Sequence, residues 1–206
     1  MGNLKNIIFD LGGVLLNIDY YKTEKAFKAL GFTEFTEMYN QYQSDVVFTR
    51  LEKGTISNDD FYNYMIKAAV GNITREQIET AWNAMLLDFR KESLSLLEQI
   101  SKKYKIYLLS NTNAIHLQAL SAVFTKQTGK ASLDDYFTKA YYSHKIRLRK
   151  PNEDIFEFVL NDAGVAAAES LFIDDSVNNI NTATRMGFKT HLLLPGEMVE
   201  KLPYFL

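Results

Sequence analysis

The chain has no cysteine among its 206 residues. This absence excludes a disulfide framework, a thiolate zinc site and a cysteine nucleophile, and it favours a reducing compartment such as the cytoplasm. No apolar run approaches the roughly 18 residues of a membrane-spanning helix. Residues 1–6 lack the basic and apolar segments of a secretion signal. We therefore expect a cytoplasmic protein that has no membrane partner.

An excess of positive charge is also missing, because the formal net charge is −2. Without a basic field the protein cannot hold nucleic acid by counterion release, so we expect no nucleic-acid partner. Apolar residues make up 47% of the chain and aromatic residues 13%, which provides for a folded core and argues against disorder. We expect a monomer or a weak homodimer.

Three short apolar runs each end on chemically capable residues. They span residues 6–10, 106–110 and 171–175, and they end on Asp10, on Ser110 and on the pair Asp174 and Asp175. Such runs are typical of buried strands in a parallel sheet, and ligands bind just beyond the carboxyl ends of these strands. We therefore expect the four residues to meet in one crevice. Three carboxylates repel one another unless a cation holds them, and a cation beside a hydroxyl indicates phosphate chemistry.

Patterns of strands and helices alternate from residue 92 onward. We predict strands at 105–109, 140–142, 170–173 and 189–194, and helices at 92–102, 113–123, 153–163 and 177–186. This alternation predicts an α/β fold with a doubly wound parallel sheet.

Residues 19–89 show no strand-like alternation and interrupt this pattern after the first strand. We predict helices at 20–30, 35–42, 45–53, 58–70 and 75–85. Ser57 with Asp60, and Thr74 with Gln77, have the spacing of capping boxes at helix starts. We predict an all-helical cap domain at 19–89, over the crevice of a core domain formed by 1–18 and 90–206.

Two motifs place a candidate nucleophile and a candidate anion site at strand ends. Asp10 is followed by Gly12 and Gly13, so its carboxylate can be exposed while backbone amides face an anion. The alternative is an ordinary turn aspartate. Ser110 and Asn111 lie between a strand and a helix, where a hydroxyl and free amides can bind phosphate. The alternative is a plain helix cap.

Two further motifs supply charge. Pro151 favours an extended backbone at Lys150, which can then reach inward toward a phosphate, while Lys145, Arg147 and Arg149 are expected on a solvated basic edge. Asp174 and Asp175 are hard oxygen ligands suited to Mg²⁺. Because successive strand side chains point in opposite directions, we expect only one of them to ligate directly. Helix capping is the alternative for this pair.

Taken in order, these four motifs resemble those of the haloacid dehalogenase superfamily, and most closely its bacterial phosphatases of glucose 1-phosphate and other sugar phosphates. The resemblance extends from Ile7 to about Leu194. It implies a Rossmann-like core with a helical cap, a small phosphorylated metabolite such as a sugar phosphate as substrate, and Mg²⁺ as cofactor. It also implies that the Asp10 carboxylate attacks phosphorus and that Lys150 offsets the negative charge.

The resemblance further implies which residues bind the metal and the phosphate. Asp10, the Gly12 carbonyl and Asp175 would ligate Mg²⁺, and Asp174 would act through a metal-bound water. The Ser110 hydroxyl and the Asn111 amide would hold phosphoryl oxygens.

One position departs from the family pattern. Gly12 stands where a second aspartate usually serves as general acid and base, and loss of such a group typically costs about 10²–10⁴ in rate. Asp19 is a candidate substitute. Two alternatives stay open: a metal-independent 2-haloacid dehalogenase, and a phosphate-ester-binding regulatory module of low activity.

Several residues of the insertion are assigned by their pattern alone. We expect the aromatic residues Phe48, Phe61 and Trp82 in its core, and Glu52 with other charged residues on its surface. His116, one turn into the helix after Ser110, is expected to border the pocket.

Overall fold

The computed structural model describes residues 4–39 and 45–205. Its centre is a five-stranded parallel sheet in the order β5-β4-β1-β6-β7. The strands span Asn6–Phe9 (β1), Lys105–Ser110 (β4), Lys139–Tyr142 (β5), Ser170–Asp174 (β6) and Lys189–Leu192 (β7). The order changes direction at β1, so the predicted doubly wound α/β fold is confirmed.

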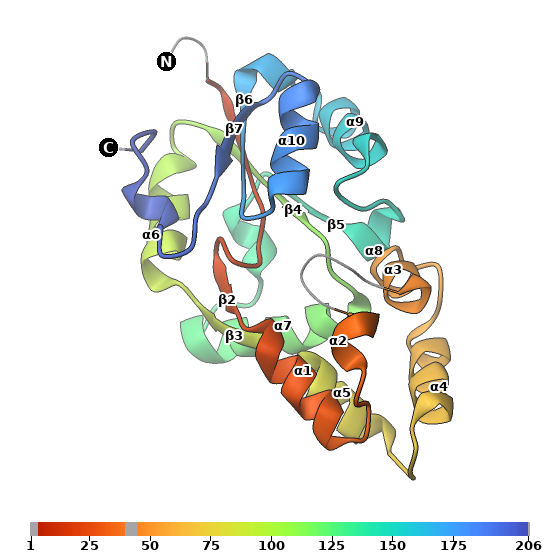
Figure 1. Ribbon diagram of the computed structural model, residues 1–206. Helices are drawn as coiled ribbons and strands as arrows, with labels where there is room; N and C mark the ends of the chain where they lie inside the picture. The colour runs from red at the N-terminus through yellow and green to blue at the C-terminus, as the bar shows by residue number, and fades with distance from the viewer. Residues whose placement is uncertain (1–3, 40–44, 206) are drawn as a thin grey trace.

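The central strands are buried on both faces, which explains their continuous apolar sequences. Ile7 and Phe9 face a cluster that includes side chains of α6 (Lys91–Ile100) and α7 (Ala114–Thr128). Ile8 faces the opposite cluster, with α9 (Glu153–Ala163) and α10 (Val177–Arg185). Figure 1 shows these two pairs of helices on opposite sides of the sheet.

The helices between residues 19 and 84 are packed around a separate apolar cluster. They span Tyr20–Ala29 (α1), Phe35–Met38 (α2), Val46–Glu52 (α3), Asn58–Ala68 (α4) and Arg75–Asn83 (α5). Phe48, Phe61 and Trp82 lie in this cluster, as predicted. Both predicted capping boxes are present, at the starts of α4 and α5. The region lies at the carboxyl end of the sheet (Figure 1).

Some secondary structure differs from the prediction. Two short antiparallel strands, β2 (Leu16–Ile18) and β3 (Leu86–Phe89), join the helical region to the core and were not predicted. The helix predicted at 35–42 ends at Met38, and its residues 40–42 lie outside the described part of the chain. The short elements α8 (Ser143–Ile146), η1 (Leu133–Tyr136), η2 (Ala167–Glu169) and η3 (Val199–Lys201) were also missed.

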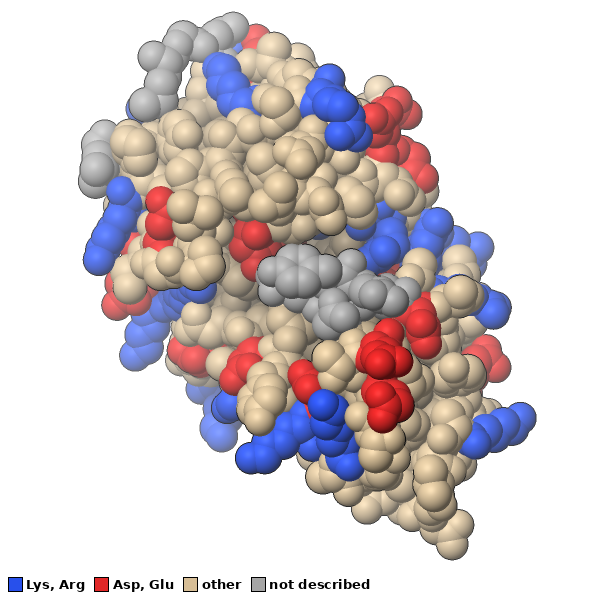
Figure 2. All heavy atoms as spheres, viewed as in Figure 1, with Lys and Arg blue, Asp and Glu red and all other residues tan. Residues whose placement is uncertain are grey.

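The predicted domain boundaries coincide with the ends of β2 and β3. The division into two domains stays a prediction. Within the described residues, no helix combines the length and the apolarity needed to cross a membrane. On the face shown in Figure 2, acidic and basic side chains are interspersed over the surface, in keeping with the small net charge.

Candidate active site

The register of the sheet brings the predicted site residues together. Phe9 pairs with Leu108 of β4 and with Ile173 of β6, so Asp10 lies between the carboxyl ends of these strands. The Asp10 amide donates to the Ile173 carbonyl at 2.9 Å, which extends the pairing by one residue. A cavity of about 470 Å³ lies there, and its lining includes Asp10, Gly12, Ser110, Asn111, Lys150 and Asp175.

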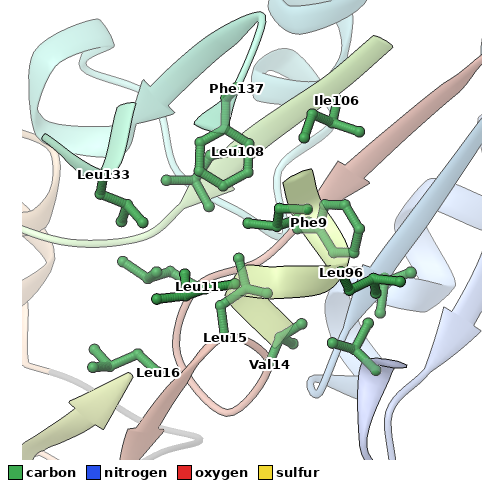
Figure 3. Close-up of a cluster of buried hydrophobic side chains, with 14 of the residues drawn as sticks. Phe9, Leu11, Val14, Leu15, Leu16, Leu96, Ile106, Leu108, Leu133 and Phe137 are labelled. Carbon is green, nitrogen blue, oxygen red and sulfur yellow. The ribbon is translucent and has the colours of Figure 1, made fainter. Parts of the chain in front are cut away.

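Apolar anchors fix the loop after Asp10. Leu11, Val14 and Leu15 are buried in the core cluster that Figure 3 shows, beside Phe9. The Leu15 amide donates to the Leu11 carbonyl at 2.8 Å, which closes a tight turn. This turn holds the two intervening glycines next to the strand end.

The surroundings of these two glycines restrict which side chains could replace them. Gly13 has φ +73°, and a Cβ there would overlap the Asp175 carboxylate, so only glycine fits without strain. A Cβ on Gly12 would lie 2.5 Å from Ile18 Cδ1. A side chain at position 12, such as the family's usual second aspartate, would therefore require the end of the Ile18 side chain to move. Asp19 caps α1 by accepting from the Tyr21 amide at 3.0 Å, and it is not among the residues that line the cavity.

Lys150 reaches the centre of the site from the loop before α9. Its Nζ donates to Asp10 Oδ1 and Asp174 Oδ2, both at 2.7 Å, and to the Leu109 carbonyl at 2.8 Å. The Asn111 side chain holds the backbone of this loop, because its Nδ2 donates to the Lys150 carbonyl and its Oδ1 accepts from the Lys150 amide, each at 2.9 Å. Asn111 thus positions Lys150 through its side chain. That its backbone amide donates a hydrogen bond to a phosphoryl oxygen stays a prediction.

Asp174 and Asp175 differ in their surroundings. Asp174 is fully buried, and its carboxylate accepts from the Ser176 amide at 2.8 Å, from Asn179 Nδ2 at 3.0 Å and from Lys150. These bonds occupy both of its oxygens. Asp175 is only partly buried and lines the cavity. That one of the two ligates a metal directly stays a prediction, and the position of Asp175 at the cavity favours it for this role.

The electrostatics favour a bound cation. Burial raises the pKa of Asp10 to about 7; Lys150 opposes this shift, and Asp174 and Asp175 add to it. Burial and then Asp174 raise the pKa of Asp175 to about 6. Burial alone would lower the pKa of Lys150, but the two carboxylates outweigh it, and the pKa is raised. One lysine therefore faces three acids.

These residues fit a magnesium ion. Carboxylate oxygens of Asp10, Asp174 and Asp175 lie within 4.8 Å of one another. Hard oxygen donors and an excess of negative charge are what Mg²⁺ requires. The Gly12 carbonyl, beside Asp10, is a further oxygen donor at the same edge.

Two charged residues expected on the surface line the cavity: Glu52 is buried, so its expected exposure was wrong, and the side chain of Arg149 is partly exposed, at 26%. Glu52 is 7% exposed, and Arg149 Nη2 lies 2.8 Å from its Oε2. Both side chains line the cavity. The sequence did hold a signal for Glu52, because it lies four residues after the buried Phe48 and one after Leu51, on the apolar face of α3.

His116 lines the cavity, as expected. It is stacked on Trp82, with ring centroids 4.6 Å apart, and its Nδ1 lies 2.8 Å from Asn83 Oδ1. Burial lowers the pKa of His116 to about 3. The ring is therefore neutral at physiological pH.

Sequence comparison identifies the family. The profile of the haloacid dehalogenase-like hydrolases matches residues 4–187. This chain belongs to that family. The resemblance drawn from the four motifs is confirmed, and the protein is an enzyme of the hydrolase class.

Three similar proteins match nearly the whole chain. A D-ribitol-5-phosphate phosphatase of Bacteroides thetaiotaomicron is 35% identical over 188 residues, which are 91% of this chain and 90% of the relative. A family enzyme of the same organism, solved as an aspartate-to-alanine variant with magnesium and inorganic phosphate, has a TM-score of 0.89 at 35% identity, covering 95% and 96% of the two chains. A family hydrolase of Porphyromonas gingivalis has a TM-score of 0.86 at 34% identity, covering 95% and 94%.

Proposed function

We propose that this hydrolase is a magnesium-dependent phosphatase of a small phosphorylated sugar or polyol. The observation that carries the proposal is the cluster of Asp10, Asp174 and Asp175, whose carboxylate oxygens lie within 4.8 Å of one another. Lys150 is bonded to Asp10 and Asp174, and Asp10, Lys150 and Asp175 line the cavity. The similarity to a ribitol-phosphate phosphatase and to a structure with magnesium and phosphate supports it.

The side chains of the cavity have distinct roles in this proposal. The Asp10 carboxylate attacks phosphorus, the alkoxide of the substrate leaves, and water then cleaves the aspartyl-phosphate to restore Asp10 and release phosphate. Lys150 holds Asp10 in place and offsets charge on the phosphoryl group. The Ser110 hydroxyl and the Asn111 amide bind phosphoryl oxygens. Asp10, Asp175 and the Gly12 carbonyl would hold Mg²⁺, which would supply further positive charge at the phosphoryl group.

The shift in the pKa of Asp10 bears on the alternative dehalogenase. Burial and the neighbouring acids raise the pKa of Asp10 although Lys150 opposes them, which favours the protonated carboxyl, and a protonated carboxyl is a poor nucleophile. A cation that lowers this pKa is therefore part of the proposed activity. Halide release from a 2-haloacid without Mg²⁺ would favour the dehalogenase instead.

Phosphate release from a substrate panel tests the proposal. The purified protein is incubated with D-ribitol 5-phosphate, sugar phosphates, nucleotides and phenyl phosphate, with Mg²⁺ or with a chelator. We expect Mg²⁺-dependent release from a sugar or polyol phosphate, loss of it in Asp10→Asn, and retention in the exposed control Asp59→Asn. Robust turnover by Asp10→Asn would refute the assignment. Tight binding of esters without turnover would favour a regulatory module.

A further inference from the structure

The helices between β2 and β3 supply a second wall of the cavity. Its side chains are Tyr20, Tyr39, Thr49, Glu52 and Met85. Tyr20 lines the cavity, and burial and the charges of Asp175 and Glu52 raise the pKa of its hydroxyl. With the phosphate beside Asp10, the rest of a substrate contacts this second wall. Glu52 is the only acidic residue on it within the described part of the chain.

The burial of Glu52 calls for a physical reason. Carboxylates are seldom buried at 7% exposure, because removal from water costs several kcal/mol unless charge and hydrogen bonds compensate. Burial raises the pKa of Glu52, and Arg149 and a hydrogen bond from Tyr39 oppose the shift. The ion pair with Arg149 supplies the counter-charge.

The hydrogen bonding of Glu52 is incomplete. Arg149 Nη2 lies 2.8 Å from Glu52 Oε2, yet within the described residues Oε2 has no aligned hydrogen-bond partner, and neither has Arg149 Nε. A carboxylate can accept about four hydrogen bonds. With a hydrogen bond from Tyr39 and a close contact with Arg149, Glu52 still keeps acceptor capacity in the cavity wall. A donor on the bound substrate would satisfy it.

The charges at this wall determine which kind of substrate group can donate a hydrogen bond to Glu52. The positive charge of Arg149 is already matched by Glu52, so the pair adds no net charge to the cavity. Among the residues that the structure describes, no second cationic side chain lines this wall, so a carboxylate or second phosphate on the substrate would meet the buried carboxylate of Glu52 without a free counter-charge. A hydroxyl group can donate to Glu52 and brings no charge.

We propose that Glu52 is a specificity-determining residue that accepts a hydrogen bond from a hydroxyl at the phosphate-free end of the substrate. The cavity then selects phosphate esters of uncharged, hydroxylated compounds over anionic or apolar ones. This inference rests on the proposed phosphatase function and extends it to the far end of the substrate.

A purely structural role for the ion pair explains less. The turn after α3 already contacts the core closely, because a Cβ on Gly54 would overlap the His144 carbonyl oxygen. Buried ion pairs also add little net stability compared with apolar side chains of similar size. Packing of the helical region against the sheet domain therefore does not require a carboxylate in the cavity wall.

The kinetic test compares an ester that bears hydroxyls with one that lacks them. We expect Glu52→Gln to lower kcat/KM for D-ribitol 5-phosphate at least tenfold more than kcat/KM for phenyl phosphate, mainly through KM, because only the former donates to Glu52. The exposed control Glu37→Gln should leave the ratio of the two unchanged. Equal losses for both esters would show a structural role and overturn the inference.

A second pair of esters tests the charge argument. The wild-type enzyme should hydrolyse sn-glycerol 3-phosphate with a higher kcat/KM than 3-phosphoglycerate, which carries a carboxylate at the far end. A preference for 3-phosphoglycerate would overturn the inference, because Arg149 would then be an anion-binding residue.

A binding measurement separates failure of this inference from failure of the proposed function. Asp10→Asn with and without Glu52→Gln is titrated with D-ribitol 5-phosphate and with phenyl phosphate in the presence of Mg²⁺. A loss of affinity confined to the ribitol ester supports the inference even if the wild-type protein hydrolyses no ester. The absence of a selective loss refutes it even if the wild type is an active phosphatase. Should Glu52→Gln fail to fold, the Glu52→Gln/Arg149→Gln double variant removes both charges together.

Discussion

Replacing Lys150 with methionine tests the electrostatic centre of the site. The Lys150 side chain is 1% exposed, and its Nζ lies 2.7 Å from both Asp10 Oδ1 and Asp174 Oδ2. Methionine keeps much of the side-chain volume and removes the charge. Removing one partner of a buried ion pair costs about 3–5 kcal/mol, a large part of the ~5–15 kcal/mol that stabilises a typical domain. We expect a loss in this range at pH 8 without Mg²⁺.

The loss should depend on pH in a defined direction. Without the lysine, burial raises the folded-state pKa of Asp10 further above its unfolded value. A buried acid of this kind is favourable when protonated, so its contribution to stability is present at low pH and is lost as the pH rises through the folded pKa. The deficit of Lys150→Met should therefore be smaller at pH 5.5 than at pH 8.

Urea unfolding at the two pH values measures both effects. Lys139→Met is the matched control, because Lys139 pairs with Asp162 at 2.6 Å but its side chain is 52% exposed, and exposed pairs contribute about 0–1 kcal/mol. In activity assays with Mg²⁺, Lys150→Met should lower kcat by about 10²–10³. A deficit below 1 kcal/mol at pH 8, or one that does not change with pH, would refute the reasoning.

Three other substitutions give distinct outcomes. Gly13→Ala should weaken Mg²⁺ binding at least tenfold by calorimetry, because its Cβ would displace Asp175; unchanged affinity would contradict this. The buried His116 ring has a pKa of about 3, whereas in the unfolded chain it is protonated below about pH 6.5, so acidification favours unfolding. Between pH 7 and pH 5 the wild type should therefore lose about 2 kcal/mol more of its free energy of unfolding than His116→Gln. Parallel plots of stability against pH for the two proteins would contradict this. Gly54→Ala should lower the free energy of unfolding by about 1–3 kcal/mol, because φ is +59° and the Cβ would overlap the His144 carbonyl. An unchanged free energy in urea unfolding would contradict this, because it would show that the backbone accommodates the added Cβ without strain.

The sequence predicted the sheet and the floor of the site well, for physical reasons. The central strands are buried on both faces, so each is a short continuous apolar run that ends where its polar residue begins. In a parallel sheet those ends meet at one edge whatever lies between them in the sequence. Asp10, Ser110 and Asp174 could therefore be assembled without knowing the intervening fold.

Features set by tertiary pairing were not predictable in the same way. β2 and β3 have three and four residues and pair across the whole helical region, so local alternation carries little signal. Glu52 and Arg149 are polar residues for which exposure is the usual state. The burial of Glu52 and the partial burial of Arg149 accompany their pairing across the cavity. The spacing of four residues between Phe48 and Glu52, which places both on the same face of α3, is the local signal that favoured burial of Glu52.

Structure determination with a heavier analogue of the metal tests the central claim most directly. Crystals grown with Mn²⁺ and inorganic phosphate allow the ion to be located by its anomalous scattering. The account predicts one ion within about 2.0–2.4 Å of carboxylate oxygens of Asp10 and Asp175, with Lys150 still bonded to Asp10. An ion bound elsewhere, or Asp175 turned away from it while phosphate lies beside Asp10, would contradict the account.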